Sequence, residues 1–344
     1  MRARVFCILT LSVALIVAPS AQAAMPSGAR DEKTVAARVA WAAEQIVPAA
    51  PTVTVSICVE AGDVMVRGWE RAEVRARAAD AEKIELRRTA AVPGDAAAAV
   101  PGSGPASRLE VLALVGEGDA AARSASSGQQ QCNLTGNVEL DVPRGSTVQI
   151  KAPGGDVAVE NVAGVRVETR GGEVVLRGIT KIVDASSGGG ALSLLNSTGG
   201  VLLRTISGEI KATDVGPSAP DDKFWAKSTS GEVSLANVTH AQVSAATTTG
   251  DISFDGTLAR AGRYDLKTHS GDIRLLLAPD AAFQLNARVY QGGEIDTEFP
   301  IRQLPGSSLG LFKDGRLTGF HGASDQFATL NLLSFDGTLE LRRK

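Results

Sequence analysis

The residue pattern closest to a catalytic motif in this chain is a short serine segment near its C-terminal end. Residues 306–310 read Gly-Ser-Ser-Leu-Gly, which has the G-x-S-x-G spacing of a nucleophile elbow. That elbow needs a strand before the serine and a helix after it, with an acidic residue and then a histidine downstream. Here Pro305 precedes the motif, and Lys313-Asp314-Gly315 is typical of a turn soon after it. We therefore interpret the segment as a Gly/Ser loop.

The other residues suited to chemistry are the histidines and cysteines. His240, His269 and His321 form no H-x-x-x-H pair, and neither Cys58 nor Cys132 belongs to a C-x-x-C motif. Zinc sites rely on such closely spaced ligands. We expect the histidines at the surface or at the edges of repeat units. We expect no catalytic residue, no metal and no cofactor, and hence no enzyme.

A short repeat must position all of these residues. It consists of Gly, then usually Asp or Glu, then an aliphatic residue, and the residue two positions after the Gly is always Val, Ile or Leu. From Gly136 to Gly293 successive repeats lie 17 to 23 residues apart. Apolar and polar residues alternate on both sides of the Gly, and a period of two indicates strands. The repeat glycines are Gly62, Gly136, Gly155, Gly172, Gly190, Gly208, Gly231, Gly250, Gly271, Gly293 and Gly337.

Such a repeat predicts the fold class. A unit of about 20 residues cannot bury its apolar face alone, whereas stacked copies bury it continuously. We predict an all-β fold, namely a single-stranded β-solenoid that resembles a parallel β-helix and has about ten rungs, with loop insertions and a small N-terminal cap. A β-sandwich of antiparallel strands joined by hairpins is the alternative.

The remaining segments are arranged around this stack. We expect a cap or linker over residues 24–50, with a short helix over 31–47, and the β-solenoid over 51–344. Two Ala-, Gly-, Pro- or Ser-rich stretches predict flexible insertions near 89–108 and 116–131, on either side of a strand over 109–115. Asp314-Gly315 is typical of a two-residue hairpin turn rather than of a further rung.

The first residues have the pattern of an export signal. Arg2 and Arg4 precede an apolar run over residues 5–17, and Ala21-Gln22-Ala23 supplies the small-x-small cleavage signature. We predict a signal peptide over residues 1–23, cleaved between Ala23 and Ala24. No later apolar run is long enough to predict a transmembrane segment after cleavage. The protein is therefore expected to be exported, to the periplasm, to the cell surface or to the medium.

The two cysteines of the mature chain occupy equivalent repeat positions. Cys58 lies four residues before Gly62, and Cys132 lies four residues before Gly136. If the segment between them loops out, the two rungs are neighbours, and equivalent Cα atoms lie about 4.8 Å apart, within the range of a disulfide. We predict that Cys58 and Cys132 form a disulfide with outward-pointing side chains. Two free thiols are the alternative.

Composition and charge limit the function classes. Hydrophobic residues make up 44% of the chain, which excludes intrinsic disorder. The chain has 35 Lys and Arg against 38 Asp and Glu and an isoelectric point near 5.8, so a nucleic-acid partner is not expected. An unidentified envelope protein or a glycan is the expected partner.

Stacking also predicts columns of like residues. The acidic residues after the repeat Gly are interpreted as a solvated turn ladder, with a cation site as the alternative: Asp156, Glu173, Glu209, Glu232, Asp251 and Asp272. A hydroxyl column before the Gly is interpreted as bonding between rungs, with an interaction surface as the alternative: Thr205, Ser207, Thr229, Ser230, Thr247, Thr249, Thr268 and Ser270. Charged residues four positions before the Gly are Lys151, Glu168, Arg204, Lys227 and Lys267.

With the repeat defined, the chain resembles the bacterial putative-adhesin domain family of exported β-solenoid repeat proteins. The resemblance rests on residues 62–70 and 73–75, on Asp141-Val142-Pro143-Arg144-Gly145, on Thr268-His269-Ser270-Gly271-Asp272-Ile273 and on the last rung over 330–342. It covers roughly residues 51–344. The resemblance implies a β-solenoid on the cell envelope, and it implies little about a ligand.

Three classes of function follow. The leading hypothesis is an exported, non-enzymatic, adhesin-like envelope protein that acts as a scaffold or binding surface. The first alternative is a polysaccharide lyase or hydrolase on a parallel β-helix, although the chain has only 3 Trp and 2 Tyr to form sugar platforms. The second alternative is a self-assembling envelope filament, since exposed strand edges can pair.

Overall fold

In a computed structural model of the protein, the structure describes residues 41–79, 84–89, 104–113, 132, 134–302, 312–313, 315–323 and 326–344. These residues belong to one compact unit, Val39–Lys344. They contain strands, turns and loops but no helix, which confirms the predicted all-β class. None of the described segments forms a helix with the length and hydropathy that a bilayer crossing requires. The expected signal peptide with its Ala23–Ala24 cleavage site, most of both insertions and the 306–310 serine motif lie outside the described residues.

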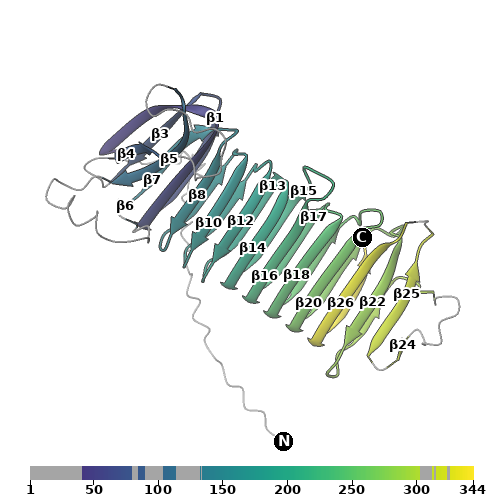
Figure 1. The fold of residues 1–344 in the computed structure, drawn as a ribbon. Helices are drawn as coiled ribbons and strands as arrows, with labels where there is room; N and C mark the ends of the chain where they lie inside the picture. Colours follow the sequence, from purple (N-terminus) through teal and green to yellow (C-terminus); the bar gives the residue numbers. More distant parts are fainter. Residues whose placement is uncertain are drawn as a thin grey trace, which may run out of the picture. The chain divides into compact units, whose positions relative to one another are not determined.

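The strands form two mostly parallel sheets that face each other (Figure 1). Each turn of the chain adds one strand to sheet 1 and then, after the repeat Gly, one strand to sheet 2. Sheet 1 has the order β4 (Ile84–Arg88), β5 (Ala106–Ala113), β1 (Ala43–Ala61), β8 (Thr147–Ala152), β10 (Gly164–Thr169), β12 (Ile182–Ser187), β14 (Gly200–Ser207), β16 (Lys223–Ser230), β18 (Gln242–Thr249), β20 (Arg263–Ser270), β26 (Ala328–Asp336), β22 (Phe283–Val289), β25 (Arg316–His321) and β24 (Phe312–Lys313).

Sheet 2 repeats this order with shorter strands. It runs β3 (Glu73–Ala78), β7 (Val138–Pro143), β2 (Val64–Trp69), β9 (Val157–Glu160), β11 (Val174–Arg177), β13 (Leu192–Thr198), β15 (Ile210–Gly216), β17 (Val233–Val238), β19 (Ile252–Gly256), β21 (Ile273–Leu277), β27 (Leu339–Arg343) and β23 (Ile295–Thr297). The two-residue β6 (Leu134–Thr135) pairs with the end of β1. The parallel, in-register pairing within each sheet supports the solenoid over an antiparallel sandwich.

Every second residue of the strands points between the sheets. In β10, Val165 and Val167 are buried, and in β11, which follows in sheet 2, Val174 and Leu176 are buried. Their neighbours on the same strands are partly or fully exposed, except at the ends of a few strands and in β7, where all six residues are buried. The buried side chains of both sheets form one apolar cluster along the stack. Small and branched aliphatic residues dominate it, which accounts for the low aromatic content of the chain.

The order of strands in the stack differs from their order in the chain. The last two strands, β26 and β27, lie between β20–β21 on one side and β22–β23 on the other (Figure 1). At the other end, β1 lies between β5 and β8, and β2 lies between β7 and β9. The first and the last strands of the described sequence are thus inserted between strands that come from the middle of the sequence.

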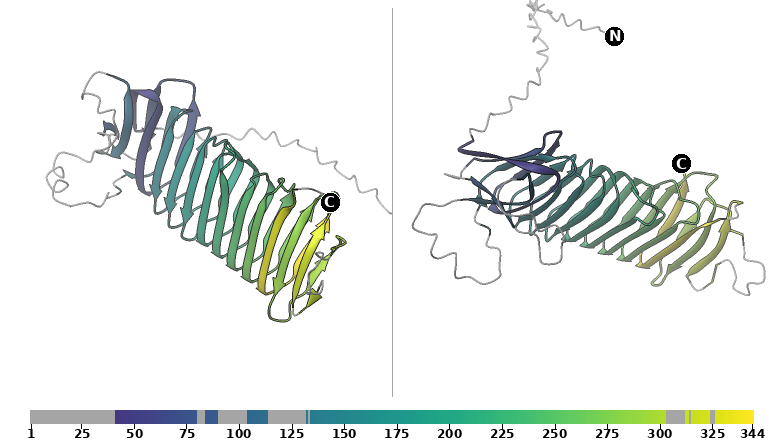
Figure 2. Two further views of the ribbon diagram at one scale, coloured as in Figure 1. Left: turned by 45° about the vertical axis from the view of Figure 1, so that its right-hand side comes forward. Right: turned by 45° about the horizontal axis from the view of Figure 1, so that its top comes forward.

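Antiparallel strands lie at both ends of sheet 1 and at one end of sheet 2, whereas the other end of sheet 2 is β23, which is parallel to β27 (Figure 2). At one end β3 pairs antiparallel with β1 and β7, and β4 pairs antiparallel with β5. At the other end β25 pairs antiparallel with β22, and β24 pairs antiparallel with β25. Lys313 and Arg316 are paired residues and Gly315 lies in a turn with φ +70°, which agrees with the hairpin interpretation. The outermost strands are short, which limits pairing with other molecules.

The helix expected over 31–47 is wrong for its last residues. Ala43–Val47 belong to β1, where they pair antiparallel with β3 from Ala43↔Ala78 to Pro48↔Glu73. Tertiary pairing overrides the helical preference of this Ala- and Glu-rich segment. Strand β1 also runs across the expected boundary at residue 51. The strand expected over 109–115 is shifted in the structure, where β5 spans Ala106–Ala113.

Candidate functional site: the outer face of sheet 1

The repeat glycines form one column at the turn between the two sheets. A Cβ built on Gly172 would lie 2.1 Å from the carbonyl oxygen of Gly155, and one on Gly271 would lie 2.2 Å from that of Gly250. Such distances exclude any side chain, because backbone atoms of the adjacent rung fill the space. The column follows the order of the stack: Gly136, Gly62, Gly155, Gly172, Gly190, Gly208, Gly231, Gly250, Gly271, Gly337 and Gly293.

The aspartates after the repeat glycines bond between rungs. Asp156 Oδ1 accepts a hydrogen bond of 2.7 Å from the backbone N–H of Glu173. Asp251 Oδ1 accepts a hydrogen bond of 2.8 Å from the backbone N–H of Asp272, and Asp272 Oδ1 accepts one of 2.7 Å from the backbone N–H of Thr338. These bonds explain why short acidic side chains recur here. Among the described residues, no group of His, Cys, Asp or Glu is arranged to hold a metal ion.

Three of the eight residues in the predicted hydroxyl column also bond between rungs. Thr268 Oγ1 donates to the carbonyl of Gly250 at 3.0 Å, and Thr247 Oγ1 to that of Gly231 at 3.0 Å. Ser228 and Ser334, which the sequence reading missed, make the same bond to Gly208 and Gly271. The bonding members stand three residues before the repeat Gly and are buried, and Thr205 belongs with them. Ser207, Thr229, Ser230, Thr249 and Ser270 lie at positions that are exposed or half-buried.

Cys58 and Cys132 are brought together by the inserted β1. The structure joins them in a disulfide with a Cα–Cα distance of 4.7 Å. Their rungs are adjacent, since Gly136 donates its N–H to the carbonyl of Ala61 at 2.7 Å. Ile57 and Val59 are buried while Cys58 is half-buried, so the cysteine side chain points away from the core. The bond links the irregular end of the stack to its regular part.

The histidines are less exposed than expected, and the prediction of a surface position is wrong for two of them, although His240 lies between β17 and β18 and His321 is the last residue of β25. His240 is fully buried, and its Nε2 lies 2.7 Å from the carbonyl oxygen of Gly199. Burial lowers the pKa of His240 below its ordinary value, despite that bond. His321 is buried against Phe283 and Phe299. Only His269 is exposed, and it stacks on Phe335 at 4.7 Å between ring centroids.

The outer face of sheet 1 carries an unbalanced charge. On strands β14, β16, β18, β20, β26, β22 and β25, the outward-facing basic residues are Arg204, Lys223, Lys227, Arg263, Lys267, Arg288 and Arg316. Among the described residues of these strands, the accessible carboxylates are Asp265, which lies between the cations, and Asp336, which is exposed at the last position of β26. We call this set of residues the basic face. It contrasts with the formal charge of −3 of the whole chain.

Asp265 does not neutralise the basic face. It is bound to Arg263 at 2.8 Å and to Asn331 Nδ2 at 2.8 Å. Although partial burial raises its pKa, the hydrogen bonds from Arg263 and Asn331 outweigh it and leave the pKa of Asp265 below its ordinary value. The carboxylate is therefore ionised and already occupied, which makes it a poor general acid.

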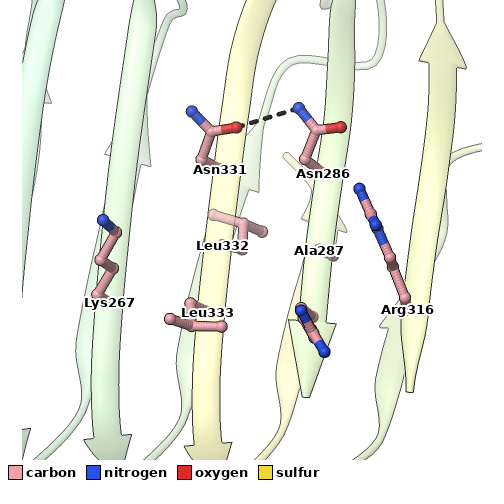
Figure 3. Close-up of a pocket in the computed structure, with 8 residues that line it drawn as sticks. Lys267, Asn286, Ala287, Arg316, Asn331, Leu332 and Leu333 are labelled. Carbon is pink, nitrogen blue, oxygen red and sulfur yellow. Dashed lines mark hydrogen bonds between the residues drawn. The ribbon is translucent and has the colours of Figure 1, made fainter. Parts of the chain in front are cut away.

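A hollow of about 220 Å³ opens on the basic face where β20, β26, β22 and β25 lie side by side (Figure 3). Lys267 and Arg316 lie on opposite sides of it, and Asn331 and Asn286 are joined between them by a bond of 3.0 Å. Arg288 also lines the hollow. Within the described part of the chain, Lys267, Arg288 and Arg316 have no carboxylate at ion-pair distance.

Aromatic rings support one edge of this hollow. The guanidinium carbon of Arg288 lies 4.3 Å from the ring centroid of Tyr290. Tyr290 stacks on Phe335 at 5.5 Å, and Phe335 in turn stacks on His269 at 4.7 Å. The rings thus form a ladder across β22, β26 and β20, and they hold Arg288 without a carboxylate.

The fold and the turn column define a class of β-solenoid repeat domains. The family model described as Toastrack DUF4097 matches residues 121–303, more than half of the chain, and the protein belongs to this family. This match confirms the adhesin-like resemblance found in the sequence. A crystal structure of a putative cell adhesion protein from Clostridium sporogenes aligns with 88% of this chain and 99% of that chain, at 12% identity and a TM-score of 0.22. No curated protein matches the chain.

Proposed function

We propose that this protein is an exported, non-enzymatic component of the cell envelope that works as a scaffold with a binding surface. The observation that carries the proposal is the basic face, where five of the seven cations have no carboxylate partner among the described residues, whereas Arg204 pairs with Asp184 and Arg263 with Asp265. A surface built only for solubility mixes charges of both signs. Other cations of the same sheet are paired, as Arg166 is with Asp184 at 2.7 Å.

Export is supported by the disulfide. Disulfides persist in oxidising compartments and are rare in the cytosol. The Cys58–Cys132 bond closes a sequence separation of 74 residues, and both cysteines stand four residues before a repeat Gly. Together with the signal-peptide pattern in the sequence, this pairing favours the periplasm, the cell surface or the medium.

The structure gives little support to the two alternatives. A lyase or hydrolase needs a free acid–base pair in a groove. Among the described residues, the carboxylate next to the hollow is Asp265, which is held by Arg263 and Asn331. A filament needs exposed edges at both ends of the stack. At the C-terminal end of the described stack the outermost strands are β24, with two residues, and β23, with three, which leaves little edge for another molecule to pair with.

The experiment that tests the proposed function is fractionation of cells that express the full chain, followed by cross-linking and mass spectrometry of the captured partners. The proposed function predicts a processed protein in the envelope or medium fraction, with envelope components cross-linked to it. Retention of the unprocessed chain in the cytoplasm would refute it. Turnover of a polysaccharide by the purified protein would refute the non-enzymatic part alone.

A further inference from the structure

The basic face contains a column of cations that runs across the strands. In-register pairing aligns Arg204, Lys227, Lys267, Arg288 and Arg316, with Ala246 and Leu333 at the positions between. Neighbouring strands lie about 4.8 Å apart, so successive cations of this column are separated by about 5 or 10 Å. The column therefore offers positive charge at regular and widely spaced points.

Two arginines at the end of this column oppose each other directly. Arg288 of β22 and Arg316 of β25 are paired residues of an antiparallel ladder. Like charges directly opposite each other in such a ladder are destabilising. Neither guanidinium has an ion-pair partner among the described residues, so an anion bound between them would relieve their repulsion.

Arg288 is positioned to bind such an anion. Contact with Tyr290 orients the guanidinium at 4.3 Å from the ring and uses none of its N–H donors. A planar guanidinium binds carboxylate, sulfate or phosphate through two parallel hydrogen bonds. Tyr290 is 47% exposed, so this end of the ring ladder is open to solvent.

Neutral polar groups lie between the cations. Asn286 donates through Nδ2 to Asn331 Oδ1 at 3.0 Å, and Asn331 donates to Asp265 at 2.8 Å. This chain of bonds fixes both amides and leaves Asn286 Oδ1 at its end, next to the hollow. A fixed amide oxygen is an acceptor for a hydroxyl group. The hollow thus combines sites for an anion with a site for a hydroxyl.

We infer that the basic face binds an acidic polysaccharide, whose carboxylate or sulfate groups contact Lys267, Arg288 and Arg316 and whose hydroxyls contact Asn286. The inference rests on the proposed function and names the ligand of its binding surface. Duplex DNA carries one charge per about 1.7 Å, far denser than this column, and the net charge of −3 opposes such a polymer. A chain of sugars with one anionic group per one or two residues matches the column better.

Binding of the disulfide-intact protein to polygalacturonate and to dextran sulfate tests the inference, with neutral dextran as the polymer control. These two polymers distinguish carboxylate from sulfate as the preferred group. The test variant is Arg288→Gln/Arg316→Gln. The matched control is Arg177→Gln/Lys211→Gln, which removes two exposed cations from the outer face of sheet 2, where neither makes an ion pair with a described residue.

The inference predicts that at least one acidic polymer binds and neutral dextran does not. The Arg288→Gln/Arg316→Gln variant should bind about tenfold more weakly, or about 1.4 kcal/mol, while the control stays within about twofold of the wild type. Without ligand, the same variant should melt no lower than the wild type, because a repulsive pair has been removed.

Three outcomes would overturn the inference: no binding of either acidic polymer, equal weakening in both variants, or tighter binding to duplex DNA or anionic vesicles than to either polymer. These results leave the proposed function intact if the protein is found in the envelope, since fractionation tests that function separately.

Discussion

The glycine column allows one sharp test of the fold, because Gly171 and Gly172 are neighbours in different surroundings. Gly172 has φ +86°, and an added Cβ would lie 2.1 Å from the carbonyl oxygen of Gly155. An added Cβ on Gly171 meets nothing within 4 Å, and its φ lies outside the left-handed region. The same change, Gly to Ala, therefore inserts a methyl group into backbone at one position and into solvent at the next.

The expected changes in the free energy of unfolding differ in sign between the two positions. At Gly172 the unfavourable φ alone costs about 1–3 kcal/mol. The clash adds to this, because the turn must shift and weaken flanking bonds such as Val157 N–H to Glu173 O at 2.8 Å. We expect Gly172→Ala to lower the free energy of unfolding by about 3 kcal/mol or more. Gly171→Ala should leave it unchanged or raise it by about 0.4–1 kcal/mol, because alanine restricts the unfolded chain.

Urea unfolding of both variants measures this difference, and hydrogen exchange locates it. The amide hydrogen of Val157 should exchange faster in Gly172→Ala than in the wild type, and at the wild-type rate in Gly171→Ala. The melting temperature of Gly172→Ala should fall by about 5 °C or more, at roughly 2 °C per kcal/mol. If the two variants differ by less than about 0.5 kcal/mol, then contact between adjacent rungs does not select glycine at the turn.

Three further predictions concern stability. The exported protein should show no free thiol before reduction, and two reactive thiols in the unreduced, denatured protein would contradict this. The free energy of unfolding of Cys58→Ser/Cys132→Ser should be lower by up to about 4.5 kcal/mol, because the unfolded chain gains entropy without the cross-link. Because the pKa of His240 is lowered in the fold, the unfolded chain binds the extra proton, so its contribution is complete above about pH 6.5 and is lost as pH falls towards the folded pKa; thermal unfolding between pH 7.5 and 5 should be less acid-sensitive in His240→Gln. Thr247→Val should cost about 1–3 kcal/mol by leaving the Gly231 carbonyl without its 3.0 Å hydroxyl bond, and urea unfolding should show no such cost for the exposed Thr248→Val.

Features that repeat in every rung could be predicted from the sequence. The repeat Gly, the aliphatic residue two positions later and the alternation around them depend on contacts between equivalent residues, so their spacing predicted two strands per turn and a parallel stack. The positions of Cys58 and Cys132 within their repeats predicted the short Cα–Cα distance for the same reason.

Features that depend on the order of rungs could not be predicted. Because the repeat units are equivalent, their sequences do not specify which rungs are neighbours. Nothing in the sequence therefore places β26 between β20 and β22. The alignment of the basic column could not be predicted either, because β26 is inserted between its members and because the distance from the cation to the repeat Gly differs by one residue between two rungs. Lys267 lies four residues before its Gly, whereas Arg288 lies five before Gly293, and pairing across β26 nonetheless aligns the two.

The insertion of β27 between β21 and β23 determines how the protein responds to mechanical force. Leu339 pairs with Ile273 on one side and with Ile295 on the other. A pull on the C-terminal residue cannot peel away an edge strand one bond at a time. It must instead slide a strand out from between two neighbours, which loads many hydrogen bonds together. Traction applied along β27 is therefore resisted in shear by the ladders to both β21 and β23.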